Sequence, residues 1–381
     1  MTIKHAAFIA GAYEHPTRKA PDKSVAQLHA ECARGALADA GLSKADVDGY
    51  FCAGDAPGMG PLSMADYMNL RVRHVDATDI GGSSYLMLVA HAAQAIKAGK
   101  CSVALITLAG RPRSDPRPRP FNPDQPDVQF EAPYGPTIPN IYGLCAQRHI
   151  HEYGTTSEQL AWIKVAASHH AQWNEHAMLR DVVTVEDVVN SPMVASPLHR
   201  LDCCVISDGG GAFIMTTRER ARDLPRPPVF VLGAAGAQTH WTISQMPDFT
   251  ESGAARCGPV AFAQAGITPA DVDTIQLYDS FTITVLLLLE GLGFCAKGEG
   301  GAFVAEGHLR KGGRLPLNTD GGGLSSCHPG MRGIFLLAEA TRQLRHQAGE
   351  AQVPNCDIAL ACGSGGWLSC IAAVILGREH P

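Results

Sequence analysis

Residues 40–48 read AGLSKADVD and residues 265–273 read AGITPADVD, so one sequence pattern occurs twice in the chain. In each copy a glycine ends a helical stretch, a Ser or Thr caps the next turn, and a strand is expected to follow. A second pair agrees, because residues 100–105 (KCSVAL) correspond to residues 355–360 (NCDIAL) and both read as buried strands. Two α/β halves of similar plan, related by an internal two-fold, explain both pairs.

This repeat divides the chain into a first half at 1–217 and a second half at 218–381. In the first half, residues 83–97 predict a buried helix, because Ala and Leu make it apolar on most faces. From residue 110 to about residue 197 the pattern breaks, and we interpret this stretch as an inserted loop domain over the active face. In the second half a strand at 274–277 ends directly before Tyr278, so the following loop is expected to deliver this side chain to that face.

The composition excludes several classes of function. The formal net charge is -6 and there is no basic stripe, so a nucleic-acid partner is not expected. No apolar run is long enough to span a membrane, and the N-terminal residues show no signal-peptide pattern. The 12 cysteines have neither a disulfide-like nor a zinc-like spacing, so we expect a cytoplasmic protein with no metal site of its own.

The start of the 83–97 helix carries residues suited to chemistry. Gly81 and Gly82 would expose backbone N–H groups at a helix N-terminus, which suit an anion or a developing oxyanion. A simpler interpretation is that both glycines only permit a tight strand-to-helix turn. Ser83 and Ser84 would need a His or Lys in contact to act as nucleophiles, so a cap or a bond to backbone is favoured. Ser83 nevertheless stays a candidate for substrate binding.

Three loops of the second half carry a family resemblance. Residues 278–281 read YDSF, residues 321–330 read GGGLSSCHPG and residues 362–366 read CGSGG. They resemble the His-Asp-Cys-Phe, Gly-His-Pro and Cys-x-Gly loops of the thiolase superfamily, in particular its sterol-carrier-protein thiolase-like branch. The resemblance extends over nearly the whole chain. It implies a five-layered αβαβα thiolase fold, a tight homodimer and an acyl-CoA substrate, with coenzyme A as part of the substrate and no covalently bound cofactor.

Two departures from that family pattern concern the catalytic residues. Family members carry a nucleophilic Cys 17 residues before the glycine that closes the buried helix, and counting back from Gly99 gives Gly82. Tyr278 stands where the branch has His. This pair of changes resembles the thiolase-like retro-aldolases that shorten steroid side chains together with a partner carrying an OB fold and a zinc ribbon. In those enzymes a second catalytic Tyr follows the His loop, whereas this chain has Arg332 there.

The resemblance also assigns expected roles. His328 would donate a hydrogen bond to the thioester oxygen and stabilise an enolate, which does not require the missing Cys. Tyr278 would relay a proton from a β-hydroxyl group, or would be a buried Tyr with a satisfied hydroxyl. Cys362 would be the acid/base thiol of the family, or a small buried apolar residue. Cys327 is a weaker candidate for an activated thiol.

The remaining candidates support these groups. Gly322, Gly323 and Gly365 would let backbone approach a flat thioester closely and donate N–H groups to it, and Asp279 would orient its loop. The His pairs at 149/151 and 169/170 lack metal-ligand spacing and are interpreted as ordinary helix or surface positions. A basic cluster, comprising Arg111, Arg113, Arg117 and Arg119, is either a solvated loop or a patch for coenzyme A phosphates.

The leading hypothesis is therefore an enzyme that cleaves or forms a carbon–carbon bond of an acyl-CoA thioester, of the retro-aldol type, without the usual Cys nucleophile. One alternative is a thiolase-type acyltransferase that uses Cys362 or Cys327. The other is a non-catalytic subunit that binds acyl-CoA or lipid, because the nucleophile is absent from the helix tip.

Overall fold

A computed structural model describes residues 3–4, 6–116, 124–125 and 129–378. Within this part of the chain, nine strands form one mixed sheet with the order β3-β2-β4-β7-β1-β8-β11-β10-β9. A separate hairpin pairs β5 (Met193–Ala195) with β6 (Leu198–His199). The strands of the large sheet are β1 (Phe8–Glu14), β2 (Gly49–Ala53), β3 (His74–Thr78), β4 (Val103–Gly110), β7 (Gly209–Thr216), β8 (Val229–Gln238), β9 (Thr274–Leu277), β10 (Ile358–Gly365) and β11 (Cys370–Gly377).

The strand order contains the internal two-fold that the repeat predicts. Outward from the centre, the first half reads β1-β7-β4-β2 and the second half reads β8-β11-β10-β9. The halves join through two residue pairs, Phe8 with Phe230 and Ile9 with Val229. Beyond β2 lies β3, and at the matching place beyond β9 a single parallel bridge joins Ile275 to Leu317. The expectation of two α/β halves of similar plan is thus confirmed.

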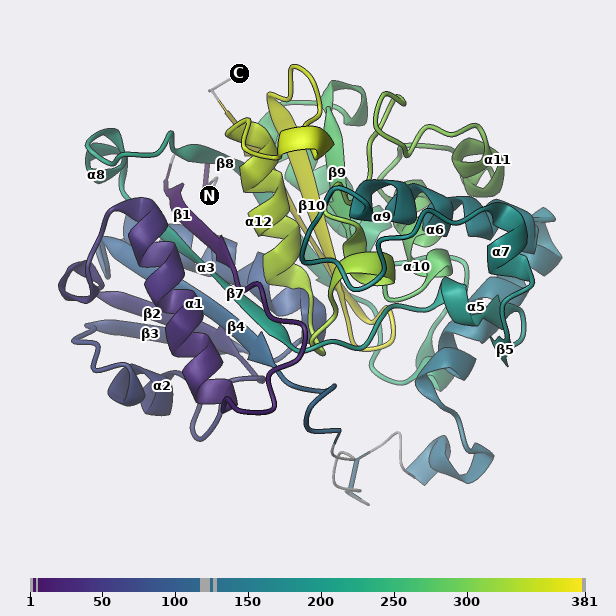
Figure 1. Ribbon diagram of the computed structural model, residues 1–381, viewed down its shortest axis with the longest axis horizontal. Helices are drawn as coiled ribbons and strands as arrows, with labels where there is room; N and C mark the ends of the chain where they lie inside the picture. The colour runs from purple at the N-terminus through teal and green to yellow at the C-terminus, as the bar shows by residue number, and fades with distance from the viewer. Residues whose placement is uncertain (1–2, 5, 117–123, 126–128, 379–381) are drawn as a thin grey trace.

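The helices form the other layers (Figure 1). They are α1 (Val25–Ala40), α2 (Pro61–Tyr67), α3 (Ser84–Lys97), α5 (Ile138–Tyr153), α6 (Ser157–Ala171), α7 (Val185–Val189), α8 (Arg218–Arg222), α9 (Ala254–Ala265), α10 (Thr282–Gly291), α11 (Gly300–Ala305) and α12 (Gly333–Leu344).

Neighbouring glycines reveal which helix covers which face of the sheet. On β7, a Cβ at Gly210 would meet Cys32 of α1, and one at Gly211 would meet Ile334 of α12. On β8, Gly233 faces α9 and Gly236 faces Met87 of α3. Helices α3 and α12 also contact each other and strands of both halves. The layers are therefore α1, first-half strands, α3 with α12, second-half strands and α9, which confirms the expected αβαβα fold.

Most predicted elements occur near their expected bounds, but some elements were missed and one strand extends further than expected. The buried helix α3 and the strand β9 match the prediction. Strand β3 was not predicted, because its residues alternate between half-buried and exposed and are not markedly apolar. Strand β10 continues to Gly365, so Cys362 lies inside a strand and not, as expected, at the opening of a loop. Glycine pairs regularly there because the ladder requires only backbone groups.

This architecture brings distant segments together at one end of the sheet. The parallel strands β9 and β10 end at the same edge, and the N-terminal tip of α3 lies against Gly365. Helices α5, α6 and α7 gather beside the second half (Figure 1), and α6 packs against a π-helical turn at Gly322–Ser326. The boundaries of the two halves and of the inserted loop domain stay predictions.

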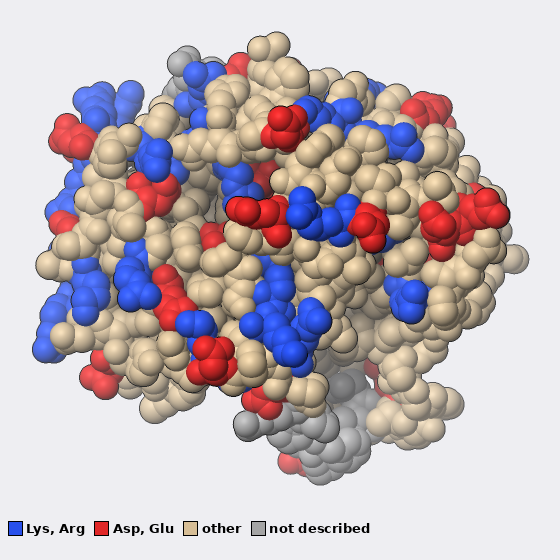
Figure 2. All heavy atoms as spheres, viewed as in Figure 1, with Lys and Arg blue, Asp and Glu red and all other residues tan. Residues whose placement is uncertain are grey.

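On the face shown in Figure 2, Lys and Arg side chains lie interspersed with Asp and Glu, so no single sign of charge dominates it. Among the helices of the described ranges, none combines the length and the apolar character that crossing a bilayer requires.

Candidate active site

The structure brings Tyr278 and His328 into direct contact. Tyr278 follows β9, and its N–H group donates to the carbonyl oxygen of Cys362 at 2.8 Å. His328 follows the π-helical turn, and its N–H group donates to Ser207 Oγ at 2.9 Å. The Tyr278 hydroxyl and His328 Nε2 are 3.1 Å apart, and the two rings meet edge to face. Two segments of the second half thus present one hydrogen-bonded pair.

Both members of this pair are uncharged near neutral pH. Burial, and then the nearby Arg332 guanidinium, lower the pKa of His328 from 6.5 to about 4. Burial raises the pKa of the Tyr278 phenol well above 10. Tyr278 can therefore pass a proton to the imidazole or receive one from it, but it does not act as a stable phenolate.

The helix tip lies against Tyr278 and leaves no room for a side chain at position 82. A Cβ on Gly82 would lie 2.1 Å from Tyr278 Cε2, 2.5 Å from Tyr278 Cζ and 2.6 Å from the carbonyl oxygen of Ser364. Contacts this short do not occur between nonbonded carbon atoms. The aromatic ring thus fills the space that a nucleophilic side chain at this position would need.

Close backbone packing holds the tip in this place. Gly81 has φ +61° and approaches Gly365 and Gly366, while a Cβ on Gly365 would lie 1.7 Å from the carbonyl oxygen of Ile80. Only glycine permits both the left-handed conformation and this approach. Gly365 therefore serves the packing of β10 against the helix tip, and its expected contact with a thioester stays a prediction.

The two serines at the tip have structural bonds. Ser83 is fully buried, and its Oγ donates to the carbonyl oxygen of Cys370 at 2.6 Å. Ser84 Oγ accepts the N–H group of Ile80 at 3.0 Å. The favoured interpretation of a bond to backbone is thus observed for both serines, and a contact of Ser83 with substrate stays a prediction.

Neither candidate thiol is activated. Gly363 and Gly365 face the tip of α3, and because successive strand residues point to opposite faces, Cys362 faces the outer layer instead. Burial raises its pKa well above 9.0, with Cys257 of α9 as a further cause. Cys327 is also fully buried, accepts a bond from Ser207 Oγ at 3.2 Å and has a pKa raised to about 11 by burial. Of the two interpretations that the sequence left open for Cys362, the structure supports the small buried apolar residue and not the acid/base thiol.

Asp279 and Arg332 form a buried charge cluster with Asp320. Arg332 Nε lies 3.6 Å from Asp279 Oδ1, its Nη2 contacts Asp320, and its Nη1 donates to the carbonyl oxygen of Cys327 at 2.8 Å. All three side chains are at most 1% exposed. Arg332 thus fixes the loop before His328. Asp279 accepts N–H groups from the turn in that loop, whereas the sequence led us to expect that it orients its own loop.

The same carboxylates use the glycine N–H groups of the π-helical turn. Gly323 N–H donates to Asp279 at 2.7 Å and Gly322 N–H donates to Asp320 at 2.9 Å. A Cβ on Gly322 would lie 2.1 Å from Asp279 Oδ2. The expectation that these two N–H groups hold a substrate oxyanion was wrong, because each already has a buried carboxylate partner.

Two polar residues beside this pair were missed by the sequence-based prediction. Ser207 positions both the His328 N–H group and the Cys327 thiol. Tyr142 of α5 stacks on Phe281 with ring centroids 4.4 Å apart, and its hydroxyl is 3.4 Å from the Gly366 carbonyl oxygen. The polar residues 207–208 lie directly before strand β7, which is a signal that could have been used. The sequence around Tyr142 offered none.

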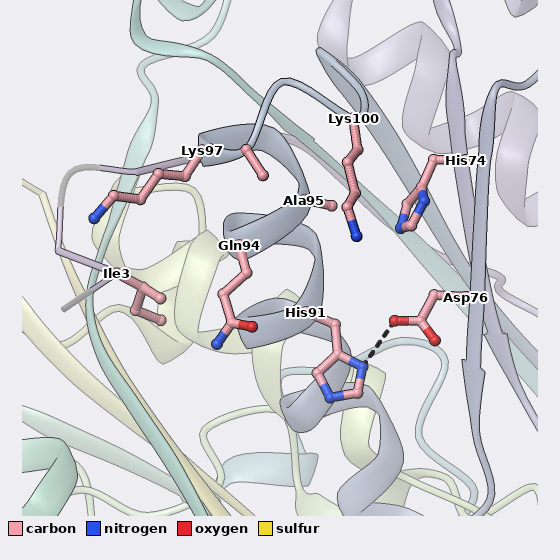
Figure 3. A pocket seen from close by; sticks show the side chains of 9 residues that line it. Ile3, His74, Asp76, His91, Gln94, Ala95, Lys97 and Lys100 are labelled. Atoms are coloured by element: carbon pink, nitrogen blue, oxygen red, sulfur yellow. Dashed lines mark hydrogen bonds and ion pairs between the residues drawn. The ribbon is translucent and has the colours of Figure 1, made fainter. Parts of the chain in front are cut away.

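A separate cavity lies away from this pair. A cleft of about 760 Å³ lies beside the C-terminal end of α3, where His91 Nδ1 is 3.0 Å from Asp76 Oδ2 and Lys100 lines the wall (Figure 3). Helix α3 has 14 residues and spans about 21 Å, so this cleft is separate from the Tyr278–His328 pair.

The other polar residues singled out in the sequence are the His pairs and the basic cluster. Within the described ranges, no three His, Cys, Asp or Glu side chains are arranged to hold a metal ion. His149 is buried against Thr155 and Glu290, and His170 bonds to the Leu317 carbonyl oxygen at 2.8 Å. Of the basic cluster, Arg113 contacts Met178 Sδ at 3.3 Å, whereas Arg117 and Arg119 lie outside the described residues.

Comparisons with known proteins show which proteins the whole chain is similar to. Residues 235–378 match the family model described as the thiolase C-terminal domain. The chain is 34% identical to an acetyl-CoA acetyltransferase of Methanothermobacter thermautotrophicus, over 94% of this chain and 95% of that protein. It is 36% identical to a steroid side-chain-cleaving aldolase of Thermomonospora curvata, over 89% of this chain and 90% of that protein. A solved structure of an Ltp2-ChsH2(DUF35) aldolase is 34% identical and superposes with a TM-score of 0.92, over 99% of both chains.

We predict that Gly82→Ala lowers the free energy of unfolding by about 1–3 kcal/mol, because the added methyl group overlaps the Tyr278 ring. Chemical denaturation measures the change. The Tyr278→Ala background is the control, since it removes the two shortest contacts while the Ser364 carbonyl oxygen remains. If Gly82→Ala lowers the free energy of unfolding equally in both backgrounds, overlap with the Tyr278 ring is not the cause of the destabilisation.

We also predict that NMR titration of the His328 imidazole gives a pKa of about 4. An unfolded His takes up its proton near pH 6.5 and the folded one only near 4, so His328 lowers stability as the pH falls through this window. The wild-type protein should therefore lose more stability between pH 6.5 and 4 than His328→Gln. A titration midpoint near 6.5 would contradict the burial argument.

Proposed function

Because this chain belongs to the sterol-carrier-protein thiolase-like branch of the thiolase superfamily, we propose that it is an enzyme acting on an acyl-CoA thioester. It cleaves or forms a carbon–carbon bond by a retro-aldol type of reaction and does so without an acyl-enzyme. The observation that carries this proposal is the Tyr278 ring in the space above Gly82. A thiolase needs a cysteine sulfur there, whereas a retro-aldol reaction does not.

The reaction needs one proton path and one site for negative charge. A β-hydroxyacyl-CoA loses its hydroxyl proton, the bond between the α- and β-carbons breaks, and a ketone or aldehyde leaves. The electron pair of that bond goes to the thioester enolate, which then takes up a proton at the α-carbon. The product is a shorter acyl-CoA, so atoms and charge balance without an external oxidant.

Tyr278 and His328 supply the proton path in this proposal. The Tyr278 hydroxyl accepts the substrate proton while passing its own proton to the neutral His328 Nε2, 3.1 Å away. The protonated imidazole can then donate to the thioester oxygen or return the proton to the enolate. The N–H groups at the α3 tip are the further donors for the enolate oxygen, because the first N–H groups of a helix lack partners within it.

The two alternatives receive less support. A thiolase-type acyltransfer through Cys362 or Cys327 would need a thiolate, and burial raises the pKa of both thiols. A non-catalytic acyl-CoA-binding subunit would not need the hydrogen bond between Tyr278 and His328, which joins two ionisable groups at the helix tip.

We also propose that the chain works as a homodimer with an OB-fold, zinc-ribbon partner that supplies any metal. The name of the similar Ltp2-ChsH2(DUF35) aldolase contains a second component, and the match to that structure covers 99% of this chain. We further propose that coenzyme A enters only as part of the substrate and that the protein acts in the cytoplasm.

The test is turnover of a series of β-hydroxyacyl-CoA thioesters, followed by mass-spectrometric detection of the shortened acyl-CoA and the released ketone or aldehyde. The chain is assayed alone and together with a co-expressed OB-fold partner. Tyr278→Phe should lower turnover about 10²–10⁴-fold, because the proton relay is lost. The matched control is Tyr67→Phe, since Tyr67 is 55% exposed on α2. Wild-type turnover by Tyr278→Phe would remove Tyr278 from the mechanism.

A further inference from the structure

Lys164 is a buried lysine that the proposed chemistry does not use. It lies on α6, 1% exposed, and its Nζ donates to the Leu324 carbonyl oxygen and to Ser325 Oγ, both at 2.7 Å. Burying an ammonium group is costly unless its hydrogen bonds and charge are matched. A methionine or leucine would fill this space without the free-energy cost of burying a charge. The ammonium charge and the N–H donors of Lys164 therefore require an explanation.

Both acceptors belong to the π-helical turn that leads to His328. Within the turn, Leu324 donates its N–H group to Asp279 Oδ2 at 3.1 Å and offers its carbonyl oxygen to Lys164. The peptide groups on either side of Leu324 are therefore held between a carboxylate and an ammonium group. Such a turn has wider hydrogen-bond rings than an α-helix and depends on outside contacts for its shape.

The charges around the turn balance. Asp279 and Asp320 are two buried negative groups, and Arg332 and Lys164 are two buried positive groups. Arg332 fixes the far end of the turn through the Cys327 carbonyl oxygen, and Lys164 fixes its middle. Without Lys164 the cluster would hold an excess negative charge in an apolar interior.

We propose that Lys164 is a positioning residue, whose ammonium group fixes the π-helical turn in the shape that sets His328 against Tyr278. This inference rests on the proposed function for its consequence in catalysis. Lys164 itself touches backbone and Ser325 and has no contact with Tyr278 or His328 among the described hydrogen bonds, so it is not placed as a nucleophile.

The proposal rests on the hydrogen bonds of Lys164 to the turn, and the protonation state of Lys164 gives a further way to test it. Burial lowers the pKa of Lys164 from 10.5 to about 8, and Asp279 opposes that change. Other ionisable groups on the elements around α6 have their own partners: Asp202 accepts from Thr282 Oγ1, Glu290 from His149, and Asp187 from Thr184. The decline of kcat at alkaline pH should therefore report the loss of the Lys164 charge.

The test compares Lys164→Met, which removes the charge and both donors, with Lys164→Arg, which keeps them. Lys44→Met on the exposed surface is the control. Lys164→Met should lower kcat on the order of 10- to 100-fold with KM nearly unchanged, because His328 loses its placement. Lys164→Arg should retain more activity, and its alkaline decline should move at least about one pH unit upward from the wild-type midpoint.

Amide hydrogen exchange gives a readout that does not need substrate. In Lys164→Met, the Gly323 and Leu324 N–H groups should exchange on the order of 10-fold faster relative to the core strands. If this occurs although no form of the protein turns over any thioester, positioning of the turn is supported and the proposed function fails. Unchanged kcat and unchanged exchange in a folded Lys164→Met protein would overturn the proposal.

Discussion

The contact between the Tyr278 ring and Gly82 is the constraint on which the rest of the site depends. The ring occupies the volume directly above the helix tip, so position 82 can carry no side chain while Tyr278 stays in place. That single arrangement removes the covalent route of a thiolase and leaves a phenol hydrogen-bonded to a neutral imidazole. The fold is retained, and the chemistry that it permits changes.

Residues that pack around the site keep Tyr278 and His328 within hydrogen-bonding distance of each other. Gly81, Gly363 and Gly365 let the tip of α3 and the end of β10 approach closely. On the other side, the buried charges of Asp279, Asp320, Arg332 and Lys164 hold the turn before His328. Buried charges cost free energy unless they are paired. Four of them around one turn therefore indicate that the shape of this turn matters beyond its contribution to stability.

How much of this could be predicted from the sequence depends on the kind of signal. The repeated segments at 40–48 and 265–273 correctly indicate two similar halves, because local residue types determine where a helix ends and a strand begins. The position of Tyr278 directly after a strand correctly places it at the helix tip. Strand β10 was expected to end before Cys362, so this residue was assigned to a loop, whereas it lies inside the strand, where alternation turns its side chain away from the helix tip. Lys164 lies in an otherwise ordinary helix, and only the fold reveals its partners.

The central claim is that bond cleavage proceeds without a covalent link between protein and acyl group, and intact-protein mass spectrometry tests it most directly. The protein is mixed with an acyl-CoA that it turns over, and the reaction is stopped with acid at times before and during product formation. The account predicts an unmodified protein mass at every time point while the products accumulate. A protein mass increased by one acyl group, appearing before the products and disappearing as they form, would contradict it.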